Sequence, residues 1–201
     1  MGQIKKDIKQ LTKAAGGKTR ARRNAEDWFF KSSKSIRENS VSNHARPFKT
    51  GMIHVFRYDK PKHMEKLPWW DSNPVVLALD PTEFGNDLGI NLNLLPVAIK
   101  EDMLDMVYDR MKGEIQSQTK GKSSGNAKKQ GQIKFTYEGA KKYLERFGLD
   151  FAIRQYIPQL KTNQKIVSYE YWAQIVLCDF IDLNGTTLGK IKYAFRNHLK
   201  K

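Results

Sequence analysis

The sequence has little of what builds disulfide-bonded, zinc-binding or membrane-spanning proteins. Cys178 is the only cysteine among 201 residues, which excludes an internal disulfide and a cysteine-rich zinc site and is typical of a reducing compartment. No apolar run reaches the roughly 18 residues of a membrane helix, and no basic segment followed by an apolar one forms a signal sequence. We therefore expect an intracellular protein that has no membrane partner.

The spacings of common catalytic and nucleotide-binding motifs are also missing. The four histidines are His44, His54, His63 and His198. Their spacing is not typical of metal ligands, and none of them lies near Cys178 in the sequence. The segment "GKSSG" lacks the preceding strand and the full spacing of a P-loop. We expect no catalytic residue, no metal site and no cofactor.

Carboxylates near the predicted strands leave one enzymatic alternative open. These carboxylates could bind Mg²⁺ in the active site of a nuclease. The candidates are Asp59, Asp71, Asp80, Glu83 and Asp87. Three of them, Asp71, Asp80 and Asp87, lie next to residues that favour turns, where an aspartate bonds its own backbone. The interpretation as turn residues is favoured over metal binding.

What the sequence does have is positive charge, and it is unevenly placed. The formal net charge is +15. Residues 1–50 carry 13 basic and 4 acidic side chains, residues 51–118 carry 7 and 11, and residues 119–201 carry 16 and 6. Two basic segments around a mildly acidic centre favour a polyanion as the partner, and nucleic acid is the leading candidate. An anionic membrane fits less well, because neither basic segment has a broad apolar face.

Three segments supply the candidate phosphate-binding side chains. The first is the basic arm, Lys13 together with "KTRARRN", and we predict that "KTRARRN" is mobile because it can bury little apolar surface. The second is the Lys- and Gly-rich stretch 116–132, predicted to be a flexible insertion, and the third is a final helix with one basic face. The candidates are Lys13, Lys18, Arg20, Arg22, Arg23, Lys120, Lys122, Lys128, Lys129, Lys190, Lys192 and Arg196.

Two adjacent tryptophans, Trp69 and Trp70 in "LPWWDSNP", are candidates for base stacking. Neighbouring side chains in an extended chain point to opposite faces, so only one of the two can form a stacking platform while the other packs inward. Structural packing is favoured for at least one of them, and the stacking alternative stays open.

The apolar pattern predicts an α+β fold, with a small antiparallel sheet or partial barrel packed with helices. Alternating or continuous apolar residues predict strands at residues 52–58, 74–79 and 88–94. The helical pattern is clearest from Ile99 to Ile115, where every fourth residue is apolar.

Further helices are predicted near residues 4–11 and 25–38, and the segments after residue 132 are predicted to be mostly helical. The domain boundaries that follow are residues 1–49 for a basic N-terminal arm with short helices and residues 50–201 for the α+β domain.

Four motifs in this order resemble a family of proteins from T-even-like tailed phages and cyanophages, the DNA end protectors. The motifs are "RYDKPK", "LPWWD", "NPVVLALD" and "LGINLNLLP", and a Met-rich helix follows them. The likeness is strongest over residues 51–111. Two positions depart from the family pattern: Trp69 and Trp70 replace a pair that is more often Tyr-Tyr, and Asn93 stands where a histidine is common.

This resemblance implies a non-enzymatic DNA-binding protein of the virion, present in the host cytoplasm during assembly. It would sit on the ends of packaged linear DNA and shield them from host exonuclease, with DNA and other virion proteins as partners and no cofactor. Two alternatives stay open. One is a structural head or neck protein whose basic ends bind acidic partner subunits, and the other is the Mg²⁺-dependent nuclease.

Overall fold

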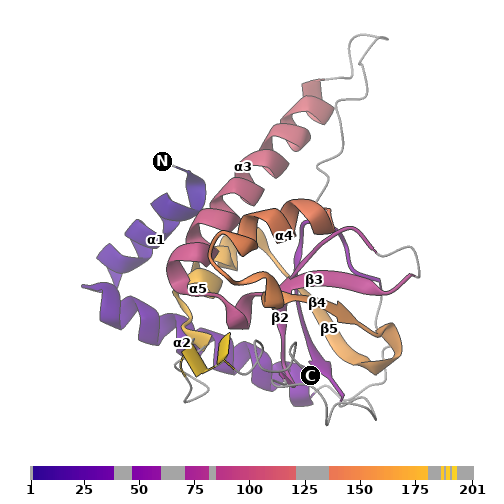
Figure 1. Ribbon diagram of the computed structural model, residues 1–201. Helices are drawn as coiled ribbons and strands as arrows, with labels where there is room; N and C mark the ends of the chain where they lie inside the picture. The colour runs from indigo at the N-terminus through magenta and orange to yellow at the C-terminus, as the bar shows by residue number, and fades with distance from the viewer. Residues whose placement is uncertain are drawn as a thin grey trace.

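The chain folds as a mixed α+β protein, seen here in a computed structural model (Figure 1). It describes residues 2–38, 47–59, 71–81, 85–120 and 136–180, and in addition Thr187, Gly189, Lys190, Lys192 and Tyr193. For residues 33–38 and 111–120 only the backbone is described.

The described strands form one open antiparallel sheet. They are β1 (Ile53–Tyr58), β2 (Val75–Ala78), β3 (Asp87–Asn91), β4 (Ile153–Tyr156) and β5 (Lys161–Val167), in the spatial order β4-β3-β2-β1-β5. The α+β class and the three predicted strands are confirmed, and the sheet is not closed into a barrel. The third strand ends at Asn91, because residues Leu92–Leu94 turn into a 3₁₀ helix whose start is capped by the Asn91 side chain.

The two edge strands β4 and β5 correct the prediction of mostly helical segments after residue 132. Both are short or polar, and their pairing partners lie far away in the sequence, so local periodicity carries little information about them. In β5, the buried Lys161 occupies a position where sequence patterns predict an exposed side chain.

Both faces of the central strands are buried, which explains the nearly continuous apolar character of β2. On one face, Ile53, Leu77 and Ile90 lie side by side on β1, β2 and β3 and belong to the main core beneath the helices. On the other face, Phe56, Tyr58, Val76 and Tyr156 form a second cluster, against which Phe48 and Leu160 pack. The prediction of a strand covered on both faces is thus confirmed for β2.

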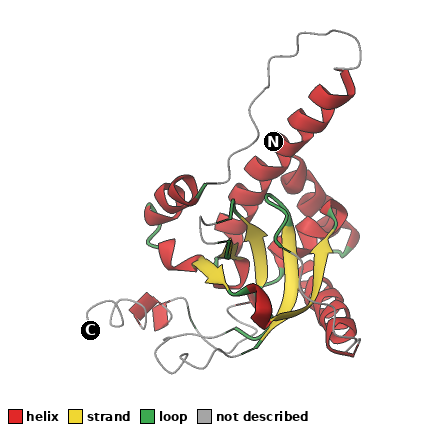
Figure 2. Cartoon of the chain, turned by 90° about the vertical axis from the view of Figure 1, so that its right-hand side faces the viewer, coloured by secondary structure: helices red, strands yellow, loops and turns green. Residues whose placement is uncertain are grey.

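The helices are α1 (Gln3–Ala14), α2 (Lys18–Glu38), α3 (Val97–Lys120), α4 (Tyr137–Glu145) and α5 (Trp172–Leu177). Helix α1 packs on α3 and α5, while α2 packs on α5 and reaches β1 and β5. Figure 1 shows α1 and α2 meeting at an angle at one side of the molecule, and the C-terminal half of α3 extends beyond the rest of the described chain (Figures 1 and 2). Among the described residues, no helix is long and apolar enough to span a bilayer.

The segment predicted to be a mobile arm is the first part of α2. Ala21, Ala25 and Phe29 recur every fourth residue and are buried in the main core, so the helix packs through a narrow face between its charged residues. Before it, Gly16 (φ 74°) and Gly17 (φ 146°) supply the positive φ angles of the turn that separates α1 from α2.

The start of the predicted flexible insertion is helical, because residues 116–120 continue α3. The rest of it, residues 121–132, lies outside the described part of the chain. The division into 1–49 and 50–201 stays a prediction. Ile4 of α1 and Ala21 of α2 belong to the same core cluster as the sheet.

An acidic side chain of α3 fixes the start of α1. The carboxylate of Asp105 accepts a hydrogen bond of 2.9 Å from the backbone N–H of Ile4, and thereby satisfies a donor that α1 does not cap itself. Next to it, Lys5 forms an ion pair of 2.8 Å with Asp102. The acidic residues of α3 therefore lie at the N-terminal end of α1, and the opposite end of α1 carries Lys13.

Candidate nucleic-acid interface

Helices α1 and α2 present a set of exposed cations. Lys6, Lys9 and Lys13 lie three and four residues apart and share one face of α1. Helix α2 exposes Lys18, Arg20 and Arg23. Across the described residues, none of these six side chains forms an ion pair, and we call them the helix cation set: Lys6, Lys9, Lys13, Lys18, Arg20 and Arg23.

The side-chain charges at the start of α2 interact unfavourably with the helix dipole. The first turn contains Lys18 and Arg20 and no acidic residue, although the N-terminus of a helix carries partial positive charge and favours anions there. Local sequence choices that work against the local structure are expected mainly at functional sites. The N-terminal end of the helix and the two cations together make this turn suited to a phosphate group.

Arg22 differs from the rest of the predicted cluster. Its side chain is half-buried, and its Nε is buried without a hydrogen-bond partner among the residues that the structure describes. The sequence placed Arg20, Arg22 and Arg23 together as exposed phosphate contacts, but the helix turns the middle one of the three toward the protein.

The predicted cations near the C-terminus fall into two groups. Lys190 is exposed, whereas Lys192 donates a 2.8 Å hydrogen bond from Nζ to the carbonyl oxygen of Phe147, which follows α4. Lys120 ends α3, and its side chain is not described. The other candidates lie outside the described residues: Trp69, Trp70, Lys122, Lys128, Lys129 and Arg196.

Two of the five carboxylates near the strands, Asp71 and Asp87, are used inside the fold, whereas Asp59 is exposed and forms an ion pair of 3.2 Å with Arg57. Asp71 accepts from the backbone N–H of Asn73 at 3.0 Å, which is the turn geometry predicted for it, and it also accepts from the side-chain amide of Asn93. Burial is the main reason that the pKa of Asp71 is raised. Within the described residues, no group of three His, Cys, Asp or Glu side chains could hold a metal ion.

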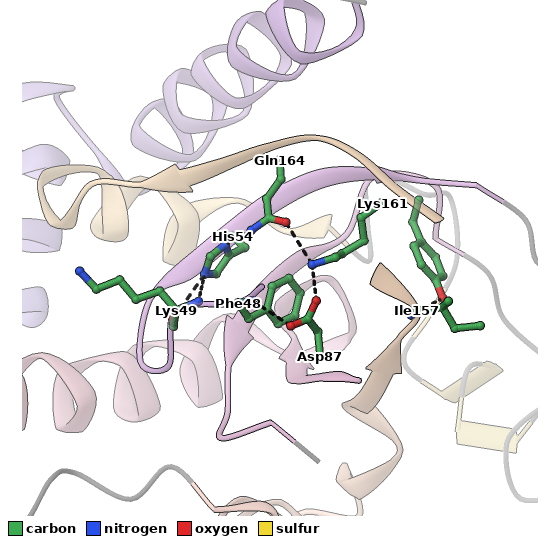
Figure 3. Close-up of polar contacts among 8 residues, drawn as sticks. Phe48, Lys49, His54, Asp87, Ile157, Lys161 and Gln164 are labelled. Carbon is green, nitrogen blue, oxygen red and sulfur yellow. Dashed lines mark hydrogen bonds and ion pairs between the residues drawn. The ribbon is translucent and has the colours of Figure 1, made fainter. Parts of the chain in front are cut away.

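Asp87 is not a turn residue but one partner of a buried ion pair, shown in Figure 3. Its carboxylate accepts from Nζ of Lys161 on β5 and, at 2.8 Å, from the backbone N–H of Phe48. The Lys161 ammonium also lies 4.2 Å from the centroid of the Phe48 ring. Sequence patterns missed this pair because 74 residues separate its members and each looks exposed by its type alone.

His54 joins the same network on the second face of the sheet (Figure 3). The Gln164 side chain accepts from Lys161 at 3.1 Å, and its nitrogen lies 2.9 Å from Nδ1 of His54. On the other side of the imidazole, Nε2 lies 3.0 Å from the backbone nitrogen of Lys49. Burial lowers the pKa of His54 to about 4, so the ring is neutral and structural near pH 7.

Lys100 is a second fully buried cation. Its Nζ donates to the carbonyl oxygens of Ile175, at 3.4 Å, and Cys178, which lie at the C-terminal end of α5. A cation at this end of a helix is favourable, although burial lowers the pKa of Lys100 to about 8. The adjacent thiol of Cys178 is buried, which raises its pKa to about 12 and leaves it unsuited to nucleophilic chemistry.

Comparison with known proteins gives one family. Its model is described as "Phage T4 terminal DNA protecting protein" and matches residues 1–188. No curated protein and no solved structure matches the chain.

Proposed function

Because the chain belongs to the family of the phage T4 terminal DNA protecting protein, we propose that it binds the ends of linear phage DNA in the virion and shields them from exonuclease without catalysing a reaction. The match confirms the resemblance noted in the sequence. It also covers α1 and α2, which the four sequence motifs did not reach.

One observation carries the proposal, namely the helix cation set on α1 and α2. Residues 2–31 contain nine Lys and Arg side chains and three Asp and Glu side chains. Exposed cations that form no ion pair within the described part of the chain can displace the counterions of a DNA backbone, and that release supplies affinity without regard to base sequence. A protein that covers the end of a genome needs this kind of contact.

The positions of the carboxylates support a non-enzymatic role. Asp71 is engaged with Asn73 and Asn93, and Asp87 is engaged with Lys161 and Phe48, so both already have strong partners. We expect purified protein with Mg²⁺ or Mn²⁺ to leave linear and circular DNA intact. Cleavage that disappears in a folded Asp71→Ala variant would favour the nuclease instead.

Exonuclease protection tests the proposal. Blunt linear duplex is incubated with the protein and then challenged with a 5′→3′ exonuclease, and the surviving full-length DNA is measured against time. We expect survival to rise with protein concentration, and the variant Lys18→Gln/Arg20→Gln/Arg23→Gln to protect less at equal concentration.

The same assay separates the proposal from the structural alternative. Equal degradation with and without the protein, together with binding to poly-glutamate, would indicate that the cations bind acidic protein partners. Binding to circular DNA as a competitor measures how much of the affinity is independent of ends.

A further inference from the structure

A pocket opens between α1, α2 and α5, beside the helix cation set. Its volume is about 240 Å³, which is smaller than the roughly 300–1,000 Å³ of pockets that hold drug-sized ligands and suits one small ring system. Seven of the nine described lining residues are apolar and four of these are alanines, among them Ala14, Ala21 and Ala25, while Asn24 and Gln174 add two amides. Ala14 and Asn24 are exposed, so the pocket reaches the molecular surface.

An aromatic pair forms one side of this pocket. Trp28 lines it and stacks on Tyr171, with the ring centroids 5.1 Å apart and the ring planes 18° from parallel. Because Tyr171 occupies one face of the indole, the pocket meets the other face or the ring edge. The next residue after Tyr171 is the fully buried Trp172, whose Nε1 donates to the Val167 carbonyl at 3.2 Å. The backbone beside Tyr171 is therefore anchored in the core.

Cations flank the pocket on two helices. Lys13 directly precedes the lining residue Ala14, and Lys18 lies three residues before Ala21, which places it near the same face of α2. A second pocket of about 220 Å³, between the sheet, α3 and α4, has Arg110 as the one cation in its described lining. That second pocket also has an apolar lining and an aromatic residue, Tyr143, so the α1–α2 pocket is distinguished by the stacked Trp28–Tyr171 pair and by its place beside the helix cation set.

A DNA end differs from the interior of a duplex in one chemical respect that such a pocket can detect. The terminal base pair exposes a flat face, whereas every interior base face is covered by its neighbours. Base–aromatic stacking is tolerant of sequence, since every base has a π-face, and this fits a protein that must act at an end of any sequence.

We propose that the α1–α2 pocket receives the terminal base of a DNA end, which leaves its base pair and stacks against Trp28 while Lys13 and Lys18 bind the adjacent phosphates. The proposal rests on the proposed function and adds the residues that distinguish an end from the interior. The helix cation set then supplies general affinity, and Trp28 with Tyr171 supplies the preference for ends.

The test compares two duplexes of the same sequence, one with open blunt ends and one closed at both ends by hairpin loops. The end preference is the ratio of their dissociation constants. Trp28→Leu is expected to lower this preference by about 5- to 150-fold, the range that one base–aromatic stack supplies, and to leave the affinity for the closed duplex and its salt dependence unchanged.

Three further variants separate stacking from a loss of folding. Trp28→Phe keeps an aromatic ring and should retain most of the preference, and Ala14→Leu fills the pocket from an exposed position and should reduce it with Trp28 intact. Phe30→Leu is the matched control, because Phe30 is an aromatic residue of the same helix, 51% exposed, that does not line the pocket. It should bind both duplexes as the wild type does. Thermal unfolding shows which variants are folded.

The outcomes distinguish this proposal from the proposed function. If the wild type prefers open ends and the folded Trp28→Leu and Ala14→Leu variants do not, the pocket is the end-binding element. If both folded variants keep the full preference, the pocket proposal is wrong and the proposed function stands. A wild type that binds open and closed duplexes equally would overturn the end-binding function, and the pocket proposal with it.

Discussion

The buried lysines of α3 and β5 and the exposed cations of α1 and α2 show two different uses of positive charge. Lys100 and Lys161 are almost completely inaccessible to solvent, and each has partners from the chain itself: the carbonyls of Ile175 and Cys178 for Lys100, and the Asp87 carboxylate for Lys161. The helix cation set is accessible and, in the described part of the chain, has no ionic partner.

The net charge of +15 therefore includes cations with two different roles, and only the exposed ones can bind an external anion. A buried cation needs an internal partner, because its desolvation must be offset, and it cannot then bind an external anion. An exposed cation in the first turn of a helix is slightly unfavourable for folding and is free to bind. The first kind of charge should therefore affect stability and not DNA affinity, and the second should do the reverse.

The largest effect on stability should come from breaking the buried ion pair. Asp87→Ala leaves the Lys161 ammonium buried without its carboxylate, and it removes the acceptor for the Phe48 N–H. We expect the free energy of unfolding in urea to fall by about 3–5 kcal/mol. The salt dependence of DNA binding by the remaining folded protein should not change.

A double variant checks the cause of that loss. In Asp87→Ala/Lys161→Met the uncompensated charge is gone and the aliphatic contacts with the Phe48 ring remain possible, so the protein should be more stable than Asp87→Ala alone. A double variant that is less stable than the single one would show that the charge itself is not the problem.

A smaller effect, up to about 3 kcal/mol, should follow from the pH dependence of His54. The pKa of His54 is about 4 in the folded protein, whereas the ordinary value for a histidine, taken here for the unfolded chain, is 6.5. Between these values the unfolded chain binds a proton that the folded chain does not, so this contribution to stability is complete above about pH 6.5 and is lost as the pH falls toward 4. Protonation of His54 would also turn Nδ1 into a donor, so that it could no longer accept from the Gln164 side-chain nitrogen.

The measurement is urea unfolding at several pH values for the wild type and for His54→Gln. Carboxylates titrate in the same range, so the informative quantity is the difference between the two proteins. The wild type should lose more stability than the variant from pH 6.5 to 4, and parallel curves would rule out a buried neutral His54.

The smallest effect on stability should come from the cations at the start of α2. Lys18→Gln/Arg20→Gln removes two charges that oppose the helix dipole, each worth about 0.3–1 kcal/mol at low ionic strength. We expect unchanged or slightly raised thermal stability, measured by circular dichroism at low salt. A clear loss of stability would mean that these side chains have structural partners and belong with the buried cations.

Much of the sheet could be predicted from the sequence, because β1, β2 and β3 have strong apolar patterns and lie close together in the chain. The long helix α3 was predicted for the same reason. Strands β4 and β5 could not be predicted, since β5 is largely polar and is defined by its pairing with β1 about a hundred residues earlier. The helical start of α2 was missed because Ala21 and Ala25 are small and stand between arginines.

The sequence allowed us to predict which charged residues of the candidate interface are exposed, but not how the fold arranges them. The exposed positions of Lys13, Lys18, Arg20 and Arg23 agree with the sequence analysis, and whether these residues bind DNA stays a prediction. The use of Lys192 at the carbonyl of Phe147 depends on tertiary contacts that no local pattern encodes. The same holds for the pocket, because Trp28 and Tyr171 come from opposite ends of the chain.

The salt dependence of binding to linear duplex DNA tests most directly whether the helix cation set binds phosphates. The slope of log K against log salt is compared for the wild type, for Lys18→Gln/Arg20→Gln/Arg23→Gln and for a control with the same change in formal charge, Lys49→Gln/Arg57→Gln/Lys165→Gln, whose residues are exposed around β1 and β5. We predict that the first variant reduces the slope by up to about 0.9 for each lost phosphate contact and that the control changes it much less. Equal slopes for the wild type and the first variant would contradict a DNA-binding role for the start of α2.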